Sequence, residues 1–164
     1  MTLQITTEQV WGAVTREIFC VLGMVTPSGE PRTVGVVHIV QNRKLYIGTG
    51  TDTWKARHIR NNPAVSITVP IPKRIPFLPW INIPAATITF SGRAKIIPAA
   101  EATDELLNKI FRHMTADEAF IRDTCLIEVI PEGEFLTYGV GVPLLKMRNP
   151  EQARGRVSVR KKTE

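Results

Sequence analysis

The turns between the first strand-like segments constrain the fold more than any other feature of this sequence. Residues 19–26, 31–40 and 45–49 are rich in apolar and β-branched side chains, which predicts three strands. The segments between them, 27–30 and 41–44, are four residues long, and the first joins a proline to a glycine, which favours a tight turn. Connections this short cannot form parallel crossovers, so we expect an antiparallel meander.

The same patterns extend to the rest of the chain. Further strands are expected at residues 64–69, 85–97, 124–130 and 134–140. Short helices are expected at 7–16 (with Trp11 as its core anchor), at about 53–61, between Leu106 and Met114, and from Thr115 onward. Thr6 and Gln9 have capping-box spacing, as do Thr115 and Glu118. The sequence therefore predicts a mainly β (α+β) fold, an antiparallel barrel with short flanking helices.

The chain length and two unusual segments bear on domain organisation. The 164 residues suit one domain, which we place at residues 1–147, followed by a basic, flexible tail at 148–164. Residues 70–84 contain five prolines, a density that excludes a central strand or helix. Three interpretations of this apolar segment stay open: a lid over a cofactor, a dimer contact, or a loop packed on its own barrel.

Charge and composition exclude several functional classes. The net charge is +6, but residues 154–164 hold five basic residues against one acid, so we do not expect nucleic-acid binding. We find neither a transmembrane-length apolar run nor a signal peptide, and we expect a cytoplasmic protein. Cys20 and Cys125 are expected to be buried free thiols. The three histidines are too scattered to indicate a metal site.

The segment from Thr49 to Lys55 is the main candidate for a site. A strand ends there in small hydroxyl residues and glycines, and a basic helix begins. Unpaired backbone N–H groups and the dipole at a helix N-terminus favour a phosphate, and Lys55 adds a positive charge. Asp52 argues for the other interpretation, because it is a good N-cap whose carboxylate would repel a phosphate. From the residues alone, helix capping and anion binding both remain open.

Residues 28–69 contain an ordered set of motifs: Gly29-Glu30-Pro31, the strand from Arg32 to Val37, Ile47-Gly48-Thr49, Thr53-Trp54-Lys55 and the run Ile59 to Val65. In this order the set resembles the pyridoxamine 5′-phosphate oxidase-like, FMN-binding split-barrel family. The resemblance implies a split barrel, a homodimer with flavin in the subunit groove, and FMN as cofactor.

The same resemblance implies roles for individual residues. The flavin ring and ribityl chain would be lined by Arg32, Thr33, Val34 and Gly35. Flavin contacts are also implied for Thr49 and Gly50, and the phosphate would be held by Thr53 and Lys55 with Trp54 beside them. The implied activity is flavin-dependent oxidoreduction of a small molecule. No residue is placed well enough to be nominated as a catalytic acid or base.

This chain departs from the true oxidases at two points. The arginine and lysine that flank their flavin-contacting strand are not both evident, although His38 stands where a basic residue might, and no tryptophan follows Trp80. We therefore do not expect vitamin B6 oxidation. Two alternatives remain within the fold: a reductase that uses a deazaflavin coenzyme, and a non-catalytic module that binds flavin or haem.

Overall fold

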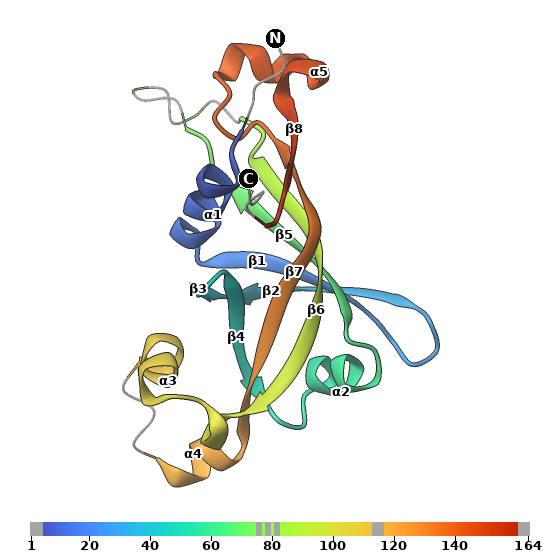
Figure 1. The fold of residues 1–164 in the computed structure, drawn as a ribbon, viewed down its shortest axis with the longest axis vertical. Coiled ribbons are helices and arrows are strands. Elements are labelled where there is room, and N and C mark those ends of the chain that lie inside the picture. Colours follow the sequence, from blue (N-terminus) through green and yellow to red (C-terminus); the bar gives the residue numbers. More distant parts are fainter. Residues whose placement is uncertain (1–4, 75–76, 78–79, 81–82, 113–116, 161–164) are drawn as a thin grey trace.

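The two longest strands, β6 (Ala86–Pro98) and β7 (Thr124–Tyr138), lie side by side in one antiparallel sheet (Figure 1). The computed structural model describes residues 5–74, 77, 80, 83–112 and 117–160. The other strands are β1 (Phe19–Val25), β2 (Pro31–Val37), β3 (Ile39–Gln41), β4 (Lys44–Gly50), β5 (Ala64–Ile71) and β8 (Arg154–Ser158). The helices are α1 (Thr7–Arg16), α2 (Trp54–Asn61), α3 (Asp104–Phe111), α4 (Glu118–Arg122) and α5 (Pro150–Ala153), with 3-10 turns η1 (Ala99–Glu101) and η3 (Leu144–Arg148).

The sheet curls because the strands at its two edges, β2 and β3, follow one another directly in the chain. Its strand order is β2-β1-β5-β6-β7-β4-β3, and β8 pairs with β7 outside this path. One residue, His38, separates β2 at one end of the order from β3 at the other. The result is a curled half-barrel with short helices around it (Figure 1), which confirms the antiparallel split barrel expected from the sequence.

The break at His38 corrects the prediction of one strand over residues 31–40. The backbone N–H of His38 donates to the carbonyl oxygen of Ile18 at 2.8 Å, and ring atom Nε2 lies 3.2 Å from the carbonyl oxygen of Val14. These contacts to the α1–β1 region bend the chain. On one side of the bend β2 pairs with β1, and on the other β3 pairs with β4.

Strand β7 corrects the prediction of two strands at 124–130 and 134–140. It continues through the Pro-Glu-Gly sequence at residues 131–133 and ends at Tyr138. The pairing with β6 shifts register between Thr89 and Ser91, and Gly133 there adopts a φ of 73°. A bulge with a left-handed glycine absorbs the extra residues, so the turn-like sequence does not end the strand.

The prediction of a flexible tail from residue 148 is wrong for residues 150–158, which form α5 and β8. Strand β8 pairs with β7 from Ser158, opposite Glu134, to Arg154, opposite Tyr138. Helix α1 also binds this segment: the Thr7 hydroxyl donates to the Ser158 carbonyl oxygen at 2.9 Å. Arg154 and Arg156 expose their side chains, whereas the backbone of this strand pairs with β7. The sequence reveals the exposed charges but not the pairing. Residues 161–164 lie outside the described residues.

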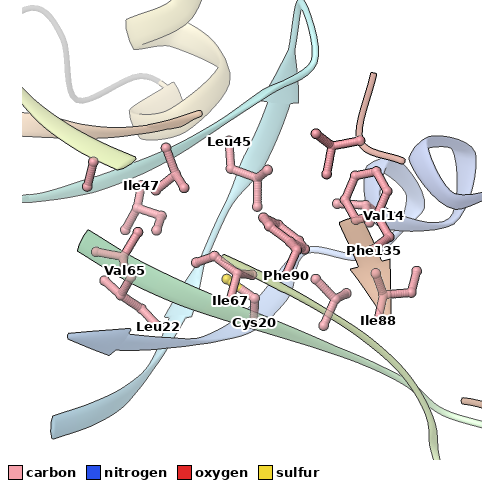
Figure 2. Packing of buried hydrophobic residues seen from close by; sticks show 14 of the residues in the cluster. Val14, Cys20, Leu22, Leu45, Ile47, Val65, Ile67, Ile88, Phe90 and Phe135 are labelled. Carbon is pink, nitrogen blue, oxygen red and sulfur yellow. The ribbon is translucent and has the colours of Figure 1, made fainter. Parts of the chain in front are cut away.

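Aromatic side chains join the sheet to α1 in the barrel core. The Phe135 ring makes edge-to-face contacts with Trp11, at a centroid distance of 5.3 Å, and with Phe90, at 5.2 Å. Figure 2 shows Phe90 and Phe135 among aliphatic side chains contributed by several strands. The expected core role of Trp11 is confirmed, and its indole N–H donates to the Val159 carbonyl oxygen at 3.3 Å. Cys20 and Cys125 are free and buried, as predicted.

Several predicted boundaries shift by a few residues. The capping box of α1 is present, whereas α4 is capped by Asp117, and Met114, Thr115 and Ala116 lie outside the described residues. Strand β5 extends to Ile71 and includes Pro70, paired with Thr87, so the exclusion of a strand from residue 70 is wrong at this one end. A proline near a strand terminus removes only one hydrogen bond from the ladder.

Candidate functional site

Thr53, and not Asp52, caps α2. The Thr53 hydroxyl oxygen accepts a hydrogen bond from the Ala56 N–H at 3.4 Å, and the hydroxyl donates to the Gly50 carbonyl oxygen at 2.9 Å. A hydroxyl has one proton, so the contact of 3.1 Å between the Thr49 and Thr53 hydroxyls must use Thr49 as donor. Asp52 is exposed and takes no part in the cap. The interpretation of Asp52 as the cap is therefore wrong, and the N-cap position is held by a neutral side chain.

The first turn of α2 retains unsatisfied donors. Among the described residues, no acceptor is found for the backbone N–H groups of Trp54 and Lys55, as expected for the first residues of a helix. The preceding turn is held in place, because the Thr51 N–H donates to the Asp123 carbonyl oxygen at 2.9 Å and Arg60 Nη1 donates to the Thr51 carbonyl oxygen at 2.9 Å. The start of α2 therefore presents two free N–H groups beside a fixed turn.

Lys55 connects this helix start to a cavity of about 410 Å³. Its ammonium lies 5.6 Å from the centre of the Trp54 ring, within range of a cation–π contact. The cavity lies beside the bend at His38, where β2 gives way to β3. The cavity is lined by the residue before β1, by the region where β2 passes into β3, by β4 and α2, and by the C-terminal end of α3. The lining residues are Ile18, Val36, Val37, His38, Ile39, Tyr46, Gly48, Lys55, Lys109, Ile110, Phe111 and Arg112.

The lining is apolar and positively charged. Lys55, Lys109 and Arg112 are its cations, and no aspartate or glutamate is part of the described lining. His38 and Tyr46 are almost fully buried, whereas Ile18 and Val37 are 69% and 64% exposed, so the cavity has a buried floor and an open apolar rim. Its volume lies within the roughly 300–1,000 Å³ of small-molecule sites. An apolar ligand with an anionic group fits this environment.

The wall formed by α3 depends on Gly48. A β-carbon at Gly48 would lie 2.8 Å from Ile110 Cγ2 and closer still to the Phe111 ring. The Phe111 ring also meets Phe120 of α4 edge-to-face, with centroids 5.1 Å apart. A glycine within a strand often marks such a close approach. This signal was available in the sequence, but it does not identify the partner.

A charged network supports the cavity at Tyr46. Its hydroxyl donates to Glu128 Oε2 at 2.8 Å, and Lys44 Nζ donates to the same oxygen at 3.1 Å. Burial, together with the Glu128 carboxylate, raises the pKa of Tyr46 to about 12. The phenol donates its hydrogen bond to Glu128, the only buried carboxylate among the described residues.

His38 lines the cavity as a neutral ring. Burial lowers its pKa, and the hydrogen bond to the Val14 carbonyl oxygen opposes that shift in part. Because a carbonyl can only accept, the neutral ring carries its proton on Nε2 and leaves Nδ1 as an acceptor. Nδ1 has no hydrogen-bond partner among the described residues.

The other residues nominated from the sequence lie away from this cavity. Arg32 and Thr33 line a separate, more open hollow of about 380 Å³, formed by residues of β1, β2, β5, β6 and β7. Val34 packs against the core. The Phe19 ring covers Gly35, where a β-carbon would lie 2.8 Å from the ring. Of the nine nominated residues, Lys55 alone lines the cavity beside His38, while Thr49, Gly50, Thr53 and Trp54 cluster next to Lys55.

Comparison with known proteins adds the family. A model described as pyridoxamine 5′-phosphate oxidase matches residues 6–138. The chain belongs to this family. No curated protein sequence matches the chain.

Solved structures with the same fold carry different functions in their names. An F420 reductase is 23% identical over 76% of this chain and 93% of its own, with a TM-score of 0.56. A heme-binding protein from Mycobacterium smegmatis is 15% identical over 97% and 60%, with a TM-score of 0.66. A heme storage protein from Vibrio cholerae is 16% identical over 85% and 97%, with a TM-score of 0.61. At these identities the likeness establishes the fold alone.

Sequence reasoning missed the contribution of α3. Lys109, Phe111 and Arg112 reach the cavity through packing between segments about sixty residues apart in the chain.

In the part of the chain that the structure describes, no helix is both long and apolar enough to cross a membrane.

Proposed function

We propose that this member of the family is a flavin-dependent oxidoreductase that holds the 5′-phosphate of FMN at the N-terminus of α2. One observation carries the proposal: Lys55 belongs both to the first turn of α2, with its free N–H groups, and to the lining of an apolar cavity. A phosphate at the helix start would place the attached apolar ring system within reach of that cavity.

Each residue would act on the cofactor through binding and orientation. The N–H groups of Trp54 and Lys55 and the Lys55 ammonium would hold the phosphate. The Thr49 hydroxyl, which now donates to Thr53, is free to turn toward a phosphate oxygen while Thr53 keeps its capping bonds. The apolar lining would exclude water from the ring. When bound, the flavin itself would supply the hydride or electron chemistry.

A deazaflavin coenzyme is the second candidate. It also carries a phosphate, which would bind at the same helix start. Its longer anionic tail would contact Arg57, which is exposed on α2. The fold likeness to an F420 reductase is compatible with this choice.

We also propose that two copies of the chain share the site. Ile18 and Val37 lie at the rim of the cavity and expose 69% and 64% of their surface, which is high for aliphatic side chains beside a binding site. A second copy packed on this rim would bury them and close the cavity.

The test begins with the absorption spectrum of the purified protein and mass identification of any molecule released on denaturation. Stripped protein is then titrated with FMN and with coenzyme F420, and binding is followed by fluorescence. Saturable binding of one of them, with reductase turnover, is the expected result. Binding of haem alone, or of neither flavin, would reject the oxidoreductase and favour a non-catalytic module.

A further inference from the structure

We propose that the end of α3 is a second anion-binding position, which recognises the carboxylate of a small organic acid whose apolar body enters the cavity. The proposal deepens the proposed function and rests on it in one respect: the α2 end of the cavity is taken by the cofactor phosphate. The acid would then be the substrate class.

The charge distribution points to a second anion. Three cations line the cavity, and the described lining contains no acidic side chain to neutralise them. Lys55 lies on α2, Lys109 lies on α3, and Arg112 is the C-cap that follows α3. In Figure 1 the two helices lie on opposite sides of the lower half of β4. One phosphate bound at α2 would leave Arg112 without an anionic partner among the described residues, while Lys109 is shared with the exposed Glu105.

The two α3 cations stand at the mouth of the cavity. Lys109 and Arg112 are exposed, while the floor is formed by the buried His38 and Tyr46. Lys109 Nζ contacts Glu105 Oε1 at 2.6 Å, but Glu105 is not part of the lining and its side chain is 67% exposed. Arg112 has no ion pair among the described residues. A carboxylate that stays partly hydrated at the mouth suits this arrangement.

Packing fixes these cations in place. Ile110 and Phe111, which lie between them in the sequence, rest on Gly48, and Phe111 is braced by Phe120. The glycine lets the end of α3 lie directly on β4, so the backbone that carries Lys109 and Arg112 is fixed beside the cavity, while their exposed side chains remain able to meet a ligand. The same two apolar side chains line the wall that the body of an acid would contact.

The test uses the full-length protein as purified and two matched fluorescent probes. 8-Anilinonaphthalene-1-sulfonate has an apolar body and one anionic group, and N-phenyl-1-naphthylamine has the same body without the charge. In the double variant Lys109→Ala/Arg112→Ala, affinity for the anionic probe should fall about fivefold, the equivalent of two partly exposed ion pairs of about 0.5 kcal/mol each. Affinity for the neutral probe should stay within about twofold of that of the unmodified protein.

A second double variant controls for net charge. Lys95→Ala/Arg122→Ala removes two exposed cations that do not line the cavity, and it should leave both probes unaffected. Equal loss of the anionic probe in both double variants, no loss in the first, or no binding of the probe to the unmodified protein would each overturn the proposal.

Cofactor titrations separate this proposal from the proposed function. The α3 double variant should bind FMN and coenzyme F420 with unchanged affinity. A loss of F420 affinity without loss of the anionic probe would assign the α3 cations to the cofactor tail and reject an acid substrate. If neither cofactor binds and the anionic probe still depends on Lys109 and Arg112, the flavin assignment fails while the second anion position stands.

Discussion

The hydroxyl oxygen of Thr49, at the end of β4, lies 3.1 Å from that of Thr53, the N-cap of α2. Thr53 uses its proton on the Gly50 carbonyl oxygen and its lone pairs on Ala56 N–H and Thr49. Capping and anion binding are therefore divided between two threonines: Thr53 stabilises the helix, and Thr49 keeps a hydroxyl that can turn to a ligand.

Replacement of Thr53 tests the capping role. Thr53→Ala should lower the free energy of unfolding by about 1 kcal/mol, because it removes the cap of α2, whereas Thr53→Ser should keep most of it. Chemical denaturation of the two variants measures the difference. Asp52→Ala, which alters an exposed side chain outside the cap, is the control; a larger loss in that variant would mean that Asp52 caps the helix in solution.

Replacement of Gly48 tests the packing of α3 on β4. Gly48→Ala should destabilise the fold by about 1–3 kcal/mol, because its β-carbon would overlap Ile110 and the Phe111 ring. Phe111→Ala opens space at the same place, so the double variant should be less destabilised than the sum of the single variants. A double-mutant cycle measures this coupling. Strict additivity would show that Phe111 does not rest on Gly48.

Tyr46 makes the stability sensitive to alkaline pH. Its folded-state pKa of about 12 lies above the ordinary value near 10, so the folded state favours the neutral phenol. The resulting stabilisation is present below about pH 10 and is lost as the pH rises from about 10 to about 12. Tyr46→Phe should therefore show a smaller loss of stability over that interval than the unmodified protein does. Parallel losses in the two proteins would contradict a pKa of Tyr46 raised by burial and by Glu128.

Truncation tests the role of the C-terminal strand. A chain ending at Ala153 loses β8, the Thr7–Ser158 and Trp11–Val159 hydrogen bonds, and the buried Val159 side chain. We expect a marked drop in melting temperature or insoluble protein, whereas a chain ending at Arg160 should melt like the full-length protein. Unchanged melting of the shorter chain would mean that residues 154–160 are a detachable tail.

Local patterns predicted most of the fold, and failures trace to contacts between distant segments. The strand break at His38 depends on Val14 and Ile18, and β8 depends on Thr7 and Trp11, none of which is a local partner. Polar alternation in a short edge strand looks like an exposed tail when the pairing strand is unknown.

Only the part of the candidate site whose residues are close together in the sequence could be predicted. Thr49, Thr53 and Lys55 lie within seven residues of each other, and the strand–turn–helix pattern identifies them together. Asp52 and Thr53 are both good caps, so the sequence could not choose between adjacent residues. The α3 wall was not predictable, because Gly48 indicates that some group approaches the strand but carries no information about which one.

The central claim, that the start of α2 holds a flavin phosphate, is tested most directly by the affinity of FMN and riboflavin for three proteins. These are the unmodified protein, Lys55→Ala, and Arg57→Ala, a matched control that removes an exposed charge of the same helix outside the cavity. We expect Lys55→Ala to weaken FMN binding about tenfold or more, with little change in melting temperature or in riboflavin binding. Arg57→Ala should leave FMN affinity nearly unchanged. FMN and riboflavin binding equally to the unmodified protein, or FMN affinity unaffected by Lys55→Ala, would contradict the claim.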